Sequence, residues 1–402
     1  MSENAPSRAT NSRSVVFSPV TLGPLRLRNR VIKAATFEGA TPHGVVTDQL
    51  IDFHTAVARG GVAMTTVAYL SVAPEGRTHA EQIVLGPATV AGLRRLTDAV
   101  HAEGAAVAAQ IGHAGPVANA KSNGAPALSP SVFFNPLGMA RTKPVSVDDM
   151  DRLTGDFASA ARRAVEAGFD AIELHLGHNY LLSSFLSRPL NRRSDGFGGS
   201  LENRARFPRR IVEAVRAEVG DRVALTAKFN MVDGFPGGLW LDESLRVARW
   251  LQDDGHLDAL TLTGGSSLMN PMYLFKGDAP RYEFAKTLPR LLRFGFRFAG
   301  TRFMPEYPYS EAYFLPFARQ FRDALSMPLI LLGGISELAT AELGIEEGFA
   351  AVAMGRALLR EPDLLRTWHA GDRSTSLCIH CNKCMPTIYS GTRCVLVDPS
   401  NG

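Results

Sequence analysis

Two histidines and a tyrosine lie within six residues of one another, at His175, His178 and Tyr180. Two imidazoles can donate hydrogen bonds to an electron-rich oxygen, and a phenol with an ordinary pKa of about 10 can deliver a proton near neutral pH. Each residue alone is more often a satisfied core or loop residue. Their clustering, and the polar, glycine-containing loop that follows at 191–199, favour an active site.

These residues must be positioned by the elements around them. An apolar run with the character of a buried strand, 170–174, precedes them, and similar short runs alternate with segments of helical spacing along the chain. A strand followed by a loop is predicted at 29–39, and further strands at 62–67, 105–111, 223–229, 257–263, 329–332 and 350–353. Helices are predicted at 48–59, 90–101, 150–167, 201–219, 243–253, 311–325, 337–347 and after Gly355. Eight such units predict an α/β fold with a parallel sheet closed into a (β/α)8 TIM barrel, with a doubly wound open sheet as the alternative.

The barrel prediction brings distant residues together. In such barrels the chemistry gathers where the carboxyl ends of the strands converge. His175 and His178 follow the predicted fourth strand, Gln110 and His113 end the third, and Lys228 ends the fifth. We expect these side chains to share one mouth.

Size and charge narrow the function classes. A chain of 402 residues, 45% of them apolar, can bury a large core, and a net charge of +4 with interspersed signs gives no case for a nucleic-acid partner. The polar start lacks a secretory signal, and no apolar run is long enough for a transmembrane segment. We therefore expect a cytoplasmic protein with a small-molecule substrate; a homo-oligomer is compatible with the sequence.

One long string carries a family resemblance. From His175 the chain reads H-x-x-H-x-Y-L-L-x-x-F-L-S, followed by N-x-R-x-D-x-F-G-G-S-L-E-N-R-x-R-F up to Phe207. This string resembles the signature of the old yellow enzyme family of FMN-dependent NAD(P)H:flavin oxidoreductases, whose longer relatives include bacterial dienoyl-CoA reductases and trimethylamine dehydrogenase. The resemblance extends from about Phe17 to the C-terminus, and it decides for the closed barrel over the open sheet.

The resemblance also implies roles for the clustered residues. His175 and His178 match the pair that grips the carbonyl or nitro oxygen of the substrate, which makes the β-carbon electrophilic toward hydride from the flavin. Tyr180 matches the tyrosine that protonates the α-carbon. The resemblance therefore implies FMN as cofactor and NAD(P)H as reductant.

Further positions match the residues that hold the flavin in this family. Gln110 matches the amide at the pyrimidine edge, and Lys228 matches a cation that would stabilise the anionic reduced flavin. The remaining cofactor-binding positions are Gly333, Gly334, Gly355 and Arg356 at the phosphate, and Ala35 and Phe37 on the first strand. A glycine pair alone is often an ordinary tight turn, but two such turns at these strand ends favour phosphate binding.

Three departures from the family pattern predict a remodelled pocket. Asn179 stands where glycine is usual, Phe37 replaces the threonine or cysteine that tunes the flavin in many relatives, and Pro116 ends the motif that begins at His113.

After the predicted sixth strand, from 264 to about 310, the regular alternation breaks. The stretch 288–309 mixes arginines with phenylalanines and tyrosines, which is too aromatic for a plain linker. It is predicted to be a loop packed on the barrel rim, a lid over a large apolar substrate, or a basic and aromatic surface that contacts a membrane edge or an acyl-CoA.

All four cysteines lie near the C-terminus, at Cys378, Cys381, Cys384 and Cys394. Gaps of two residues let neighbouring thiolates reach one ion or cluster, so the spacing predicts a metal site without specifying the metal. The longer relatives carry a [4Fe–4S] cluster here, although their last gap is longer and further domains follow. A [4Fe–4S] cluster, zinc and free thiols remain open.

These observations combine into one expectation. Residues 1–16 form a disordered tail, residues 17–372 an FMN-binding barrel with the insertion at 264–310, and residues 373–402 a cysteine-rich extension. The predicted function is an NAD(P)H-dependent ene-reductase that acts on enones, enoates, nitroalkenes or dienoyl thioesters. The alternatives are an FMN-dependent amine dehydrogenase or demethylase, and a non-catalytic flavin or electron-transfer protein.

Overall fold

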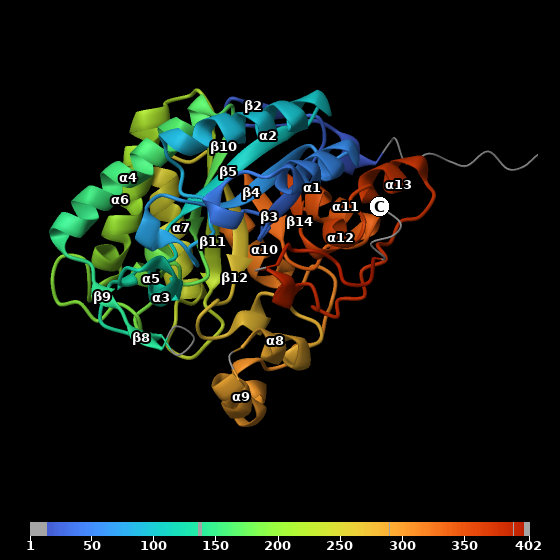
Figure 1. Cartoon of the computed structure of the whole chain (residues 1–402). Coiled ribbons are helices and arrows are strands. Elements are labelled where there is room, and N and C mark those ends of the chain that lie inside the picture. The colour runs from blue at the N-terminus through green and yellow to red at the C-terminus, as the bar shows by residue number, and fades with distance from the viewer. Residues whose placement is uncertain (1–13, 136–138, 289, 389, 398–402) are drawn as a thin grey trace, which may run out of the picture.

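The centre of the molecule is a closed barrel of eight parallel strands (Figure 1). The structure is a computed structural model that describes residues 14–135, 139–288, 290–388 and 390–397. In barrel order the strands are β3 (Val31–Phe37), β4 (Met64–Ser71), β5 (Ala106–Gly112), β10 (Ala171–Leu176), β11 (Ala224–Val232), β12 (Ala259–Gly264), β13 (Leu329–Leu332) and β14 (Ala351–Met354). The predicted (β/α)8 barrel is confirmed.

Helices surround the barrel and bury their apolar faces against it (Figure 1). They are α1 (Asp48–Arg59), α2 (Val90–Ala102), α4 (Val147–Glu166), α6 (Leu201–Val219), α7 (Leu241–Asp253), α10 (Leu315–Ala324), α11 (Leu338–Glu346), α12 (Arg356–Arg360) and α13 (Leu364–Ala370). Side-chain caps fix several starts: Ser146 and Ser200 each accept the backbone N–H three residues on. The helix predicted at 201–219 is confirmed to the residue.

The helix predicted at 311–325 begins later, at Leu315. Ala312 has a φ of +47°, outside the helical range, and its N–H donates to the carbonyl of Gly334 at 2.6 Å. This contact across the chain holds the segment before Leu315 in an irregular conformation that no local pattern indicates.

The end of the barrel at which the strands begin, opposite their carboxyl ends, is closed by a small hairpin, β1 (Val20–Leu22) and β2 (Leu25–Leu27). Leu22 and Leu27 are buried against the interior residues at that end of the strands. Val16, which falls within the predicted tail, is also fully buried in a 3-10 helix (Val15–Phe17). Residues 1–13 of that tail lie outside the described residues.

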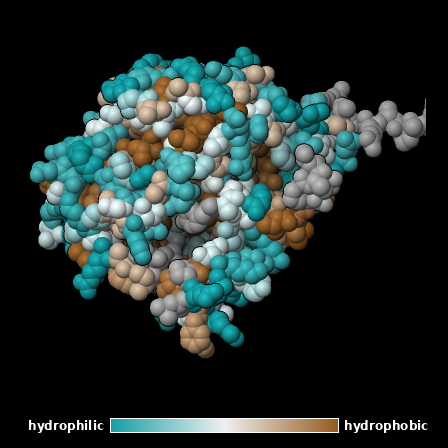
Figure 2. Space-filling view, in the orientation of Figure 1, coloured by the Kyte–Doolittle hydropathy of each residue, from teal (hydrophilic) through white to brown (hydrophobic). Residues whose placement is uncertain are grey.

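The insertion between β12 and α10 contains two helices, α8 (Arg281–Thr287) and α9 (Arg290–Phe303), which project from the barrel (Figure 1). Phe284 of α8 packs against Phe296 and Phe303 of α9, with ring centroids 5.4 and 6.1 Å apart. On the other side of α9, Phe294 and Phe298 are 66% and 76% exposed. Hydrophobic and hydrophilic side chains therefore lie next to each other on this projection (Figure 2).

The chain after α13 returns to the mouth of the barrel. Thr392 donates its N–H to the carbonyl of Glu38 at 2.7 Å, and its hydroxyl donates to the carbonyl of Phe37, at the end of β3. Lys383 also pairs with Glu283 of α8 at 3.5 Å. None of the helices in the described part of the chain combines the length and apolar composition that a membrane crossing requires.

A buried ion pair joins β3 to the start of the following loop. The Lys33 ammonium lies 2.9 Å from the Glu38 carboxylate, and both side chains are almost completely shielded from solvent. The other carboxylate oxygen accepts the N–H of Ala68 on β4 at 3.0 Å. Burial lowers the pKa of Lys33 and raises that of Glu38, so each charge depends on the other.

Replacing Glu38 with alanine tests this dependence. We expect Glu38→Ala to lower the free energy of unfolding by about 3–5 kcal/mol, because it leaves the Lys33 ammonium buried without a counter-charge. The matched control is Glu202→Ala in the Glu202–Arg246 pair, which is about half exposed, so its loss should lower the free energy of unfolding far less. Denaturant-induced unfolding measures both, and equal losses would contradict the assignment.

Candidate active site

His175, His178 and Tyr180 form one cluster with Tyr69 of β4. The His175 ring stacks on Tyr180 with centroids 4.3 Å apart, and it meets the His178 ring edge-on at 5.1 Å. The ring centroids of Tyr69 and Tyr180 lie 5.3 Å apart, and the Tyr69 hydroxyl donates to the Gly76 carbonyl at 2.8 Å. The structure thus brings together the three residues that the sequence singled out.

The strand that carries His175 is longer than predicted. β10 extends to Leu176, so His175 is part of the barrel wall and pairs in register with Lys228 of β11. Lys228 likewise lies within β11, which continues to Val232, and does not end its strand. Parallel pairing with the neighbouring strands extends both elements beyond their apolar runs. His175 and Lys228 are therefore held rigidly.

His178 lies in a loop with an unusual backbone. His178 and Asn179 have φ values of +60° and +58°, in the left-handed region that glycine favours and asparagine tolerates. The asparagine that departs from the family pattern therefore keeps the conformation that a glycine would adopt. The His178 N–H donates to Asn230 at 3.0 Å, and its Nε2 lies 3.1 Å from the Thr263 hydroxyl. These two contacts fix the ring.

Both imidazoles are neutral near pH 7. Burial, followed by the nearby Lys228 charge, lowers the pKa of His178 to about 3. Burial, His178 and Lys228 together lower the pKa of His175 well below its usual value. The Gly177 N–H points at Nδ1 of His175 at 3.2 Å, which places the ring proton on Nε2. The cluster can thus donate hydrogen bonds without carrying charge.

Three charged or polar side chains fill the barrel interior beneath this cluster. The Gln110 amide donates to the Glu173 carboxylate at 2.7 Å, and the Lys228 ammonium lies 3.4 Å from the same carboxylate. All three side chains are buried. The predicted cofactor residues Gln110 and Lys228 therefore share a partner that the sequence did not indicate.

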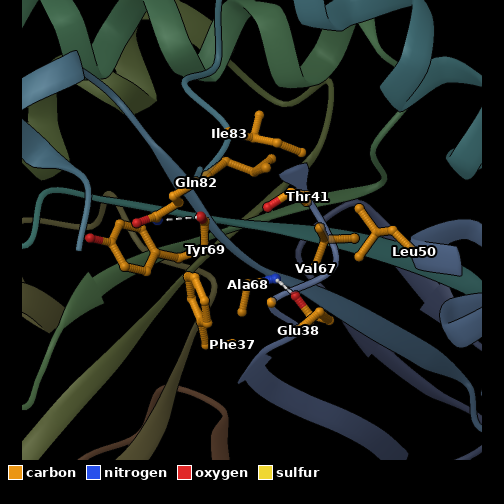
Figure 3. Close-up of a pocket in the computed structure, with 11 residues that line it drawn as sticks. Phe37, Glu38, Thr41, Leu50, Val67, Ala68, Tyr69, Gln82 and Ile83 are labelled. Atoms are coloured by element: carbon orange, nitrogen blue, oxygen red, sulfur yellow. Dashed lines mark hydrogen bonds between the residues drawn. The ribbon is translucent and has the colours of Figure 1, made fainter. Parts of the chain in front are cut away.

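The end of β3, where Ala35 and Phe37 lie, borders a small pocket beside β4 (Figure 3). Phe37 lines this pocket with Tyr69 and Gln82, and the Gln82 amide donates to the Tyr69 carbonyl at 2.6 Å. Phe37 and Tyr180 both pack against the apolar cluster that includes Tyr69. The departure at Phe37 thus adds an aromatic wall next to the tyrosine cluster.

The residues predicted at the phosphate follow β13 and β14. Gly333 and Gly334 have φ values of +115° and +74°, and a Cβ on Gly334 would lie 2.5 Å from the Tyr313 ring. Glycine is required there. The Arg356 guanidinium donates through Nη1 to the Lys276 carbonyl at 2.8 Å and to Asn382 at 2.5 Å. One end of this guanidinium is therefore already occupied by the protein.

The four cysteines gather in one neighbourhood as free thiols. Burial raises the pKa of Cys384 to about 11, opposed by the Arg356 charge and reinforced by Cys378, Cys381 and Cys394. Within the described ranges, no group of three or more His, Cys, Asp or Glu side chains is arranged to hold a metal ion. Metal binding requires thiolates, and burial disfavours the thiolate form of Cys378 and Cys384 by raising the pKa of each. The structure does not support the predicted iron–sulfur or zinc site.

Comparison with known proteins shows which family the chain belongs to. A sequence profile described as the NADH:flavin oxidoreductase / NADH oxidase family matches residues 15–258. The chain belongs to this family. The resemblance to the old yellow enzymes is thereby confirmed.

Two relatives are informative. The chain is 58% identical over 383 residues to a 4,4'-dithiodibutanoate disulfide reductase of Rhodococcus erythropolis, with 95% of each chain covered. It is 31% identical over 366 residues to a multifunctional alkene reductase/demethylase of Caballeronia cordobensis, of which it spans half the length. Among solved structures, a 2-naphthoyl-CoA reductase is similar with a TM-score of 0.82 at 22% identity, over 96% of this chain and 58% of that one. That likeness concerns the fold alone.

The chemical types of the residues at the site suit the binding of FMN. A buried amide (Gln110) and a buried cation (Lys228) face the interior of the barrel mouth. In the Gly333-Gly334 turn, a side chain at either position would clash with neighbouring atoms, so the backbone there stays bare. When bound, FMN would supply the transfer of hydride from NAD(P)H to a substrate. Gln110 and Lys228 would hold its ring, and the glycine turn its phosphate.

Sequence reasoning missed Glu173, Tyr69, Asn230 and Thr263. A signal existed for Glu173 and Asn230, because each is a polar residue inside an otherwise apolar strand. Tyr69 and Thr263 carry no such signal, since an aromatic or β-branched residue in a strand is ordinary.

The lowered histidine pKa values predict a pH dependence of stability. The unfolded chain binds a proton at His178 below about pH 6.5, whereas the folded chain does so only near pH 3. Stability should therefore fall as the pH falls, by roughly 2–3 kcal/mol for this one group between pH 7 and 4.5. Unfolding measured at both pH values should show a smaller drop for His178→Gln than for the wild type, and equal drops would contradict the buried neutral state.

Proposed function

We propose that the chain uses FMN and NAD(P)H to reduce small organic disulfides. The observation that carries this proposal is the identity of 58% to a disulfide reductase over 95% of both chains. The chemistry is a two-electron reduction in which hydride reaches one sulfur, the S–S bond breaks, and the second sulfur leaves as a thiolate that takes a proton. NAD(P)H is oxidised, and two thiols are formed.

The neutral cluster suits this reaction. Negative charge develops on the departing sulfur in the transition state, and preorganised N–H donors in a water-poor site stabilise such charge. His175 presents an Nε2 proton, because its Nδ1 accepts the Gly177 N–H. Tyr180, stacked on His175, is placed to supply a proton.

Reduction of activated C=C bonds is the second candidate, as the sequence predicts. The His175, His178 and Tyr180 cluster supports it, and so does the relative named as a multifunctional alkene reductase/demethylase, whose name also includes the demethylase alternative. The same donors would bind a carbonyl or nitro oxygen, and Tyr180 would protonate the α-carbon. The two substrate classes differ in what they require of Tyr180.

Amine oxidation is less well supported. An alkylammonium substrate requires an open cage of aromatic rings. The insertion does bring Tyr273 and Tyr313 together, but the ammonium of Lys276 already lies 5.5 and 5.2 Å from their ring centres. A cation of the protein thus occupies this aromatic pair, which weighs against the dehydrogenase or demethylase alternative.

The substrate classes can be separated by turnover. Protein reduced anaerobically with NADH or NADPH should be reoxidised by 4,4'-dithiodibutanoate, and cyclohexenone and a methylated amine serve as the competing acceptors. Reoxidation by the enone alone would favour the second candidate. Flavin that no acceptor reoxidises would contradict both.

Tyr180→Phe should affect the two classes unequally. A carbon must be protonated for an alkene to be reduced, so we expect a loss of about 10²–10⁴-fold in that reaction. A thiolate is far more stable in water than a carbanion and can leave without first taking a proton, so disulfide reduction should fall by roughly tenfold or less. Stopped-flow reoxidation measures both rates in the same variant, and equal losses would refute the assigned role.

The insertion is proposed to act as a lid at the barrel mouth. Its first segment lies beside the active site, because the Ser267 N–H donates to the His178 carbonyl at 3.1 Å. Deleting residues 288–302, which include most of α9, should reduce kcat/KM for bulky acceptors severalfold more than for small ones. Equal reductions would show that the projecting helix does not cover the substrate.

A further inference from the structure

A buried carboxylate inside the barrel has no role in the reaction described above. Glu173 lies near the middle of β10, between Ile172 and Leu174, and is 6% exposed. The interior around it is lined mostly by apolar side chains, such as Ile32, Met64 and Ile330, together with Lys228 and threonines that include Thr261. A carboxylate in such apolar surroundings is costly to retain unless strong partners offset its lost hydration.

The two partners come from the strands on either side. Gln110 of β5 is the in-register neighbour of Glu173 and donates through Nε2 at 2.7 Å. Lys228 of β11 places its ammonium 3.4 Å from the same carboxylate oxygen, Oε2. One oxygen atom thus connects the two side chains that are proposed to face the flavin ring.

This contact decides which end of the Gln110 amide faces outward. An ionised carboxylate only accepts hydrogen bonds, so it selects the NH₂ end of the amide. The carbonyl oxygen of Gln110 is then left to face the mouth, where it can accept a hydrogen bond from a ring N–H. Without Glu173, either end of the amide could point to the mouth.

The same carboxylate changes the charge that Lys228 presents. A lone ammonium in a low-dielectric interior exerts a strong field on its surroundings, and a carboxylate 3.4 Å away cancels part of it. The field of Lys228 still reaches the histidines, as shown by its lowering of the pKa of both His175 and His178. Glu173 therefore limits how strongly Lys228 favours negative charge at the mouth.

We propose that Glu173 is a positioning residue that sets the reduction potential of the bound flavin. It acts through two contacts, by fixing the Gln110 amide and by offsetting the Lys228 charge. The inference rests on the proposed flavin site. Glu173 itself is not placed in contact with substrate.

The sign of the effect follows from the charge. Reduced flavin is the more negative form, and a cation nearby favours it. Glu173→Gln removes the offsetting charge, so Lys228 should stabilise the reduced form more strongly and raise the potential. We expect at least a tenfold change in the ratio of reduced to oxidised flavin at fixed potential, which is about 30 mV for a two-electron couple.

The experiment measures the flavin midpoint potential and the FMN dissociation constant of purified holoprotein. The variants are Glu173→Gln, Lys228→Met and the double variant, since a double-mutant cycle isolates the coupling between the two residues. Thr261→Val is the matched control, because Thr261 lines the same interior without charge. Glu173→Thr repeats the test with a residue type that already lines this interior, in case the glutamine variant does not fold.

The possible results distinguish the proposed role of Glu173 from a packing effect and from the absence of a flavin site. A higher potential in Glu173→Gln that largely disappears in the Lys228→Met background, with Thr261→Val unchanged, supports the proposal. An unchanged potential in both Glu173 variants overturns it, and so does an equal shift in Thr261→Val, which would reflect packing alone. Wild-type protein that binds no FMN would instead refute the proposed flavin site.

Discussion

The positive charge of Lys228 is buried within the barrel wall, and the groups around it are arranged in response to that charge. Glu173 lies 3.4 Å from its ammonium and stabilises it in the buried interior of the barrel. Burial favours the neutral form of His175 and His178, and the same ammonium lowers the pKa of both further. The histidines can therefore act as hydrogen-bond donors while the net charge of the site stays low.

The fold was predictable wherever the signal is local. The helix at 201–219 was placed correctly because Ser200 caps its start and Gly220, with a φ of +55°, ends it. Strand ends were less predictable, since β10 and β11 continue for as long as their neighbours pair with them. Ala312 shows the limit most clearly, because its conformation depends on a carbonyl more than twenty residues away.

The candidate site likewise has residues that local sequence could identify and contacts that it could not. The chemical types of His175, His178 and Tyr180 at close spacing were sufficient to nominate them, and the structure brings them together. The partnership of Glu173 with Gln110 depends on strand register, which no local pattern gives. The cysteine spacing indicated a metal, but spacing alone does not determine how a segment packs once it lies against the barrel.

The segment that follows α13 ties the end of the described chain to its first barrel strand. Thr392 contacts the carbonyl groups of Phe37 and Glu38, and the hydroxyl contact joins residues 355 positions apart. A nascent chain on the ribosome that already contains all the strands still lacks this contact and the one between Asn382 and Arg356. Contacts of such long range form late in folding. The mouth of the barrel thus acquires its final shape only after the segment around Thr392 has been synthesised.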